Sequence, residues 1–297
     1  MRRLTAVLIL LTLVPIALAT RPPALREYRG ILHCHSLHSH DSKGTYEEIL
    51  AAAKAAKIDF IAMTDHPPKD ETIPFREGWR GLHDGVLFLQ GAEYAGQHLL
   101  AVGTREPVHG STAEKIEAIH RQGGLAFLSH PEEVEDWTPY AAADGVEIYN
   151  VHAALKKRLK EPGFIPEVLR ALKADPETSF QLLRRLDPDI LAKWDAVNRI
   201  RPFTGIAAND AHQNTAFFGT RLDPYPRAFR FVTTRVRAAA LTEAAILDAL
   251  RAGRCRVEFS DAPDPRDVET VVVGARRELW IRKDGERRPW ILENWKR

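Results

Sequence analysis

Histidine and carboxylate side chains recur in this chain at the ends of short apolar runs, in positions that suit metal binding. The clearest stretch, Ile31 to Asp41, reads ILHCHSLHSHD. Residues i and i+2 of a strand lie on one face, so His33 and His35 can direct their imidazoles to one point while Cys34 faces away. Imidazole is a common metal ligand, and Asp41 adds a carboxylate oxygen a few residues later. This stretch therefore predicts a metal site at the end of a buried strand.

The same residue types follow several later strands that the sequence predicts. Eight candidate ligands fall at or just after the end of a predicted strand: His33, His35, Asp41, His66, Glu93, His130, Asp210 and His212. The carboxyl ends of the strands of a βα barrel meet at one face, which carries the active site. So many polar and ionisable groups gathered in one place require cations to compensate them. The mixture of imidazole and carboxylate suits Zn, Mn or Fe better than Ca or Mg.

Short apolar runs alternate with amphipathic stretches from Tyr28 onward, which is the pattern of βα units around a parallel sheet or barrel. Thr45 and Glu48 form a capping-box pattern, which predicts a helix over Tyr46–Lys57. The other helices expected in this part are 113–122 and 242–252. The expected strands are 58–64, 86–90, 98–102, 125–128, 146–149, 205–208 and 229–233.

Two segments depart from this alternation. Between about residues 153 and 201, Lys and Arg interleave with Leu, Ile and Trp194, which predicts a helical insertion beside the site with a solvated charged face. Near the C-terminus, strands at 268–273 and 278–282 with a turn at Asp284–Gly285 predict a small β appendage. We therefore expect a barrel domain over 28–262 and an appendage over 263–297.

The composition limits the class of protein. A chain of 297 residues with 44% hydrophobic content can bury a full core, as one barrel-sized domain or two smaller ones. The formal net charge of +2 argues against a dedicated nucleic-acid partner or a polybasic membrane surface. Cys34 and Cys255 are too few for a disulfide framework, so both are expected as free, buried thiols.

Together the segments LHCHS, SHDS, MTDHP, GAE, LSHP and ANDAH resemble the PHP (polymerase and histidinol phosphatase) superfamily of metal-dependent phosphoesterases, from Gly30 to about Phe259. The resemblance implies an α/β fold, a distorted (β/α)7 TIM-like barrel, with a trinuclear metal site at the carboxyl ends of the strands. Carried over by motif, the first metal would take His33, His35, Glu93 and Asp210. The second metal would share Glu93 as a bridging ligand and take His130 and one further residue. The third metal would take Asp41, His66 and His212.

Some of these assignments have alternatives. His98 is the expected further ligand of the second metal, because it opens the next strand, and a buried strand-edge histidine is its alternative. His40 is the alternative to Asp41 at the third metal. The other histidines are expected at the surface or around the site: His38, His83, His109, His120 and His152. Of these, His152 is the first choice for contacting substrate. Cations for the phosphate oxygens are expected from Lys43, Arg76 or Lys156.

The cluster predicts an enzyme, a metal-dependent phosphoric ester hydrolase that acts on a small soluble phosphate mono- or diester. About two to three divalent Zn, Mn or Fe ions would activate a water as hydroxide and neutralise phosphate oxygens. Glu93 is the expected bridging and catalytic residue, with His152 at the substrate. Asp65 is expected in proton transfer or in support of His66, with a structural cap as the alternative.

Two other classes of protein remain possible from the sequence. An amidohydrolase-type barrel also uses a His-x-His pair, but it usually needs a carboxylated lysine at a strand end, and no lysine stands at such a position here. A non-catalytic metal-binding PHP module would be favoured by loss of ligands. Only His98 is uncertain among the nine expected ligands, so the sequence favours the phosphoesterase.

The N-terminal segment has the pattern of an export signal. Arg2 and Arg3 precede an apolar run from Ala6 to Ala19, which ends in a small-x-small cleavage pattern. The run is too short for a comfortable membrane span, with an uncleaved anchor as the alternative. We expect a signal peptide at 1–19, a leader at 20–27, and an exported, periplasmic or extracellular protein without a membrane span after cleavage.

Cleavage after Ala19 should leave a mature chain that begins at Thr20. Mass spectrometry of the protein recovered from an exporting host tests this expectation. Recovery of the intact Met1 form in the soluble cytoplasmic fraction would contradict it.

Overall fold

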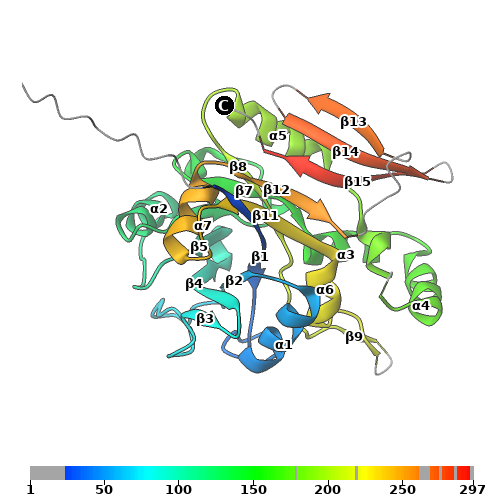
Figure 1. The fold of residues 1–297 in the computed structure, drawn as a ribbon, viewed down its shortest axis with the longest axis horizontal. Coiled ribbons are helices and arrows are strands. Elements are labelled where there is room, and N and C mark those ends of the chain that lie inside the picture. The colour runs from blue at the N-terminus through cyan, green and yellow to red at the C-terminus, as the bar shows by residue number, and fades with distance from the viewer. Residues whose placement is uncertain are drawn as a thin grey trace, which may run out of the picture.

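The computed structural model describes residues 24–177, 179–217, 220–260, 268–273, 276–283 and 286–294. The export segment, its cleavage point and the turn expected at 284–285 lie outside these ranges. Within them, strands run through the middle of the molecule and helices lie around them (Figure 1). None of the helices in the described ranges is long and apolar enough to cross a membrane.

The helices and strands alternate over most of the chain. The helices are α1 (Tyr46–Ala56), α2 (Thr112–Arg121), α3 (Val151–Leu159), α4 (Phe164–Ala174), α5 (Pro188–Asn198), α6 (Tyr225–Phe231) and α7 (Glu243–Arg251). The strands of the main sheet are β1 (Arg26–Cys34), β2 (Phe60–Met63), β3 (Gly81–His83), β4 (Val86–Tyr94), β5 (Leu99–Val102), β6 (Leu125–Leu128), β7 (Gly145–Asn150), β8 (Thr204–Ala208), β11 (Val232–Ala238), β12 (Cys255–Phe259), β13 (Val268–Val273), β14 (Arg276–Lys283) and β15 (Glu286–Glu293). A separate pair consists of β9 (Ala216–Phe217) and β10 (Thr220–Arg221).

The main sheet is mixed, which corrects the expectation of parallel strands. Its order is β13-β14-β15-β12-β11-β1-β2-β4-β5-β6-β7-β8, with β3 paired to β4. The pairs β1–β2, β2–β4, β6–β7 and β7–β8 are parallel. β5 is antiparallel to β4 because only residues 95–98 connect the two strands, and a parallel crossover needs a dozen or more residues. β5 is also antiparallel to β6.

The hydrogen bonds show a mixed α/β sheet and do not confirm a closed (β/α)7 barrel. In the described part of the chain, the ladder between β8 and β1 is limited to a single bridge. It joins Cys34, the last residue of β1, to Ala211, three residues after β8. Beside this bridge, the Asp210 amide donates to the His33 carbonyl at 2.9 Å, and the His35 amide donates to the Ala211 carbonyl at 3.0 Å. The segment after β8 therefore lies directly beside the end of β1.

One expected strand begins in the wrong place. Residues 229–231 continue helix α6, and β11 starts at Val232. The helix buries Tyr225, Ala228 and Phe229 against the core, whereas the β-branched residues from Val232 onward favour the strand. The strands β12 and β15, which pair with each other, were not expected at all.

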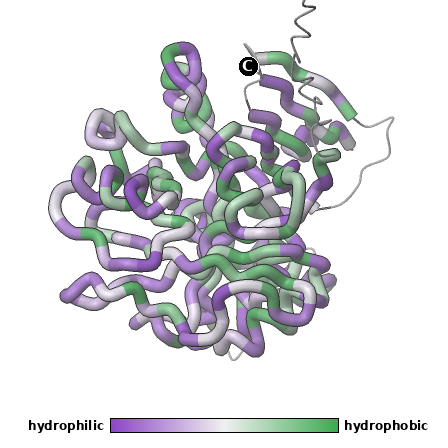
Figure 2. Tube along the Cα trace, turned by 60° about the vertical axis from the view of Figure 1, so that its left-hand side comes forward, coloured by the Kyte–Doolittle hydropathy of each residue, from purple (hydrophilic) through white to green (hydrophobic). Residues whose placement is uncertain are grey.

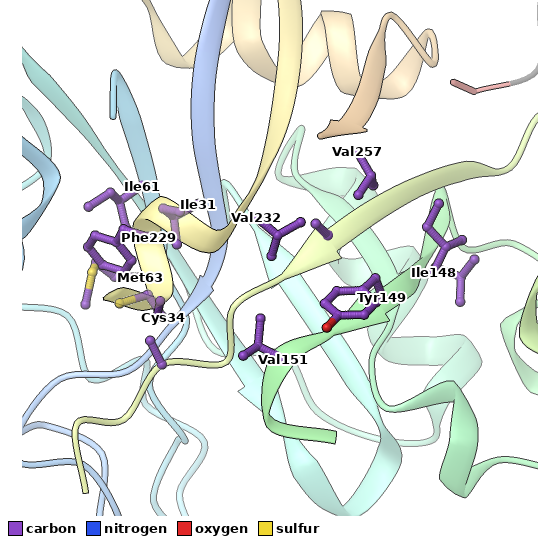
Figure 3. Close-up of a cluster of buried hydrophobic side chains, with 14 of the residues drawn as sticks. Ile31, Cys34, Ile61, Met63, Ile148, Tyr149, Val151, Phe229, Val232 and Val257 are labelled. Atoms are coloured by element: carbon purple, nitrogen blue, oxygen red, sulfur yellow. The ribbon is translucent and has the colours of Figure 1, made fainter. Parts of the chain in front are cut away.

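Apolar side chains fill the space between the strands and the helices that cover them. Figure 3 shows Ile31, Ile61, Met63 and Phe229 close together, with Cys34 beside them. Figure 2 shows the resulting alternation of hydrophobic and hydrophilic segments along the chain. Both cysteines are free and buried, as expected.

Trp194 connects three parts of the molecule. Its side chain on α5 is fully buried, and its indole Nε1 donates to the Phe203 carbonyl at 2.7 Å, just before β8. Gly205 on β8 leaves room for the ring, since a Cβ there would lie 2.6 Å from it. On the C-terminal strands, Arg276 lies 5.2 Å from the ring centroid and donates to Asp195 at 2.7 and 3.0 Å. Figure 1 shows α5 beside β14 and β15.

Trp194→Ala should lower the free energy of unfolding by about 3–5 kcal/mol, because it removes a large buried ring and leaves a cavity. Urea unfolding measures the change. Ile200→Ala is the matched control, since Ile200 is 86% exposed and its truncation should change stability by less than about 0.5 kcal/mol. Equal stability of the two variants would contradict the role given to Trp194.

Candidate metal centre

The candidate ligands come together at the ends of β1, β2, β4, β6 and β8. They are His33 on β1 and His35 just after it; Asp41 in the following loop; His66 after β2; Glu93 on β4; His130 after β6; and Asp210 and His212 after β8. The link between β8 and β1 brings the last two beside the first two.

Four buried residues form the central group: His33, His35, Glu93 and Asp210. One ligand atom from each lies within 4.8 Å of those of the other three. The Nε2 atoms of His33 and His35 are 2.9 Å apart. Glu93 Oε2 lies 3.0 Å from Nε2 of His33 and 3.3 Å from Nε2 of His35, while Asp210 Oδ1 lies 3.4 Å from both.

A second group joins His35 to Asp41, His66 and His212. Asp41 Oδ2 lies 3.3 Å from Nε2 of His66 and 3.2 Å from Nε2 of His212. The ring of exposed His40 is 5.1 Å from that of His66, but His40 belongs to none of the ligand groups in the described residues. The geometry thus gives Asp41, rather than His40, the position of a ligand.

The remaining expected residues differ in their positions. His130 Nε2 lies 3.2 Å from Glu93 Oε1 and 3.3 Å from Asp210 Oδ2, so it faces the central group. His152 on α3 forms a third group with Asp210 and His212. His98 has a buried Nδ1 without a hydrogen-bond partner, and no contact within the described ranges joins it to the other ligands.

The imidazoles share one pattern of hydrogen bonding. An oxygen atom lies within hydrogen-bond distance of Nδ1 in each ring: Glu147 Oε1 at 2.6 Å from His33, Ser39 Oγ at 3.3 Å from His35, the Glu93 carbonyl at 3.2 Å from His66, Glu132 Oε1 at 3.2 Å from His130, and the Asp210 carbonyl at 2.9 Å from His212. With the proton on Nδ1, each Nε2 directs a lone pair toward the cluster.

This donor set fits divalent cations. Lone pairs that face each other at short range repel unless a cation lies between them, and Glu93 Oε1 and Asp210 Oδ1 are buried without a hydrogen-bond partner. Burial alone would raise the pKa of Glu93 and of Asp210, but when His33 and the other imidazoles are protonated their charge holds both pKa values well below the usual range. Both carboxylates are therefore ionised and able to serve as ligands.

Glu147 is a functional residue that the sequence analysis missed. It is buried on β7, where Oε1 accepts from His33 and Oε2 accepts from the His130 amide at 3.1 Å and from Asn150 Nδ2 at 3.0 Å. Asn150 also donates to Asp210 Oδ2 at 3.3 Å. A carboxylate inside an otherwise apolar strand was the signal that could have identified it, because such a group needs partners.

The other expected residues support the loops around the site. Asp65 accepts from the Ser36 amide at 2.5 Å and from its hydroxyl at 2.7 Å, which favours the structural role, and burial raises its pKa. Arg76 pairs with Glu47, and Lys156 pairs with Glu133 at 3.3 Å. Exposed Lys43 follows the site loop, and its amide donates to the His212 carbonyl at 3.3 Å. Of the three expected cations, Lys43 is the one whose backbone contacts a candidate ligand.

Glu147→Gln should weaken metal binding by about 10–100-fold, because the neutral amide holds His33 less firmly and lowers the basicity of its Nε2. Competition with a chromogenic chelator measures the affinity. The control is Glu117→Gln, the same change at a carboxylate that is 70% exposed on α2. Equal metal affinities of the two variants would show that Glu147 does not support the site.

Comparison with known proteins adds a family to this geometry. Residues 32–133 match the model of the PHP domain. This range contains six of the candidate ligands: His33, His35, Asp41, His66, Glu93 and His130. Among curated protein sequences, none matches the chain significantly.

The fold resembles that of a solved two-domain protein from Bacteroides vulgatus ATCC 8482 that contains a predicted PHP-like metal-dependent phosphoesterase. The TM-score is 0.50 at 15% sequence identity, covering 92% of this chain and 88% of that one. PsfC from Pseudomonas syringae PB-5123 is more distant, with a TM-score of 0.45 at 12% identity, over 75% of this chain and 88% of that one. At these identities the fold comparison rests on the first structure and concerns the fold alone. Residues 32–133 of this chain therefore match a PHP domain, and the fold as a whole resembles that of the Bacteroides protein.

Proposed function

We propose that this protein is a metal-dependent phosphoesterase that hydrolyses a small phosphate mono- or diester. The observation that supports this most directly is the central group, in which imidazole nitrogens and carboxylate oxygens converge and Glu93 Oε1 and Asp210 Oδ1 are buried without a hydrogen-bond partner. A set of neutral nitrogen and anionic oxygen donors suits Zn, Mn or Fe. The PHP domain match over residues 32–133 supports the same chemistry.

The proposal includes about two to three ions in a shared site. The residues that would hold them are His33, His35, Glu93 and Asp210 for the first; Asp41, His66 and His212, with His35 adjacent, for the second; and His130 with Glu93 and Asp210 for the third. When bound, such ions neutralise phosphate oxygens and lower the pKa of a water molecule.

The side chains around these positions have separate tasks. Glu93 directs Oε2 toward His33 and His35 and Oε1 toward His130, so it is the carboxylate that two ions would share. His152 is half-buried, and its ring lies 5.4 Å from that of His212, within reach of an ester bound there. Exposed Lys43 is the cation proposed for a phosphate oxygen, because its backbone amide lies beside His212.

The alternatives are less well supported. An amidohydrolase-type centre requires a lysine among the ligands, whereas buried Lys115 pairs with Glu71 and not with a candidate ligand. A non-catalytic module would be expected to have lost ligands, whereas eight of the expected nine lie together here. Export of the enzyme is part of the proposal, and it rests on the N-terminal sequence pattern alone.

Glu93→Gln should reduce hydrolysis by at least about three orders of magnitude and lower the metal content, because a shared negative charge is lost. A panel of phosphate mono- and diesters with added Mn or Zn measures activity, and elemental analysis of the purified protein measures metal. The control is Glu77→Gln, the same change at an exposed residue outside the site.

Two results would overturn the proposal. One is a well-folded wild-type protein that takes up no transition metal and hydrolyses none of the esters. The other is a Glu93→Gln variant with full metal content and wild-type activity.

A further inference from the structure

A second cluster of charge lies at the opposite end of the central strands from the metal centre. Arg235 and Arg237 on β11 pair with residues 29 and 27 at the start of β1, whereas the metal ligands follow its other end. A hollow of about 540 Å³ opens here among β11, β12, β14 and β15. Five arginines and one carboxylate provide its charged lining: Arg235, Arg237, Arg254, Arg256, Arg277 and Glu293.

Like charges face each other across these strands. Arg235 lies directly opposite Arg29 on β1 and directly opposite Arg256 on β12. Such pairs destabilise a sheet unless a counter-charge compensates them. Glu258 accepts from Arg235 at 2.7 Å and from Arg256 at 2.8 Å, and Glu27 accepts from Arg256 at 3.0 Å.

The arginines of the hollow outnumber the carboxylates that they share. Beyond Glu27 and Glu258, Arg254 pairs with Asp248 at 2.6 Å and Arg277 pairs with Glu293 at 2.5 Å. That leaves five lining arginines with four carboxylates. The side chain of exposed Arg237 donates to no acceptor in the described part of the chain, and the buried Nε of Arg254 has no hydrogen-bond partner.

We infer that this hollow binds a phosphate-type oxyanion. The planar guanidinium group donates two parallel hydrogen bonds to a phosphate, and every cationic residue of the lining is an arginine. The unpaired donors of Arg237 and Arg254 provide the contacts, and a multivalent anion compensates the opposed charges. The phosphate belongs either to a small soluble molecule or to a lipid headgroup. This site is separate from the metal centre and does not depend on its activity.

Calorimetric titration of the full-length protein with pyrophosphate tests the small-molecule source. Arg237→Gln, alone or combined with Arg254→Gln, should raise the dissociation constant of pyrophosphate at this hollow at least about tenfold, since each change removes hydrogen bonds to a charged group. Arg199→Gln is the matched control, an exposed arginine that follows α5 and lies outside the hollow. Thermal unfolding verifies that each variant is folded, and phosphate ester hydrolysis should stay at the wild-type rate in all of them.

Sedimentation with vesicles tests the lipid source. Vesicles of phosphatidylcholine alone are compared with vesicles that also contain phosphatidylglycerol, using the same variants. Binding of either probe that falls in Arg237→Gln but not in Arg199→Gln supports the inference, and the probe identifies the source. Absence of binding to both probes, or equal binding by both variants, overturns it. A wild-type protein that binds pyrophosphate through these arginines but hydrolyses no phosphate ester would contradict the proposed function and leave this inference intact.

Discussion

Two imidazole nitrogens that face each other at 2.9 Å inside the protein impose the main constraint on this fold. His33 and His35 are fully buried, and their Nε2 lone pairs meet the oxygens of Glu93 and Asp210. Such a group is costly to assemble without bound cations, because each atom loses its contact with water. The strands β1, β2, β4, β6 and β8, each with a candidate ligand at or just after its end, hold the group together against this cost.

Much of the surrounding structure orients those atoms. Glu147 is held between His33, the His130 amide and Asn150, so one carboxylate supports two candidate ligands from a third strand. The carbonyls of Glu93 and Asp210 accept from His66 and His212, so two ligands also position two others. Removing one member of this network would therefore disturb its neighbours, and single substitutions in the cluster should not be additive.

The sequence revealed the ligands more readily than the architecture. His33, His66, Glu93 and Asp210 each end an apolar run, and that local signal predicted their meeting point. The direction of β5 follows from a connection too short for a crossover. The helical conformation of residues 229–231 in α6 follows from the burial of Phe229 against the core, and no local sequence pattern shows that burial. Asp41 and His40 are adjacent, and only the loop geometry separates the ligand from its neighbour.

Cys34 stands between two candidate ligands, yet its sulfur points into the core beside Met63 and Phe229 (Figure 3). The alternation of side chains along β1 keeps a soft thiolate donor away from an ion bound at the cluster. Such an ion would meet only nitrogen and oxygen atoms. Because Cu(I) is selected by thiolate and thioether ligands, the alternation of one strand makes the site a poor host for that metal.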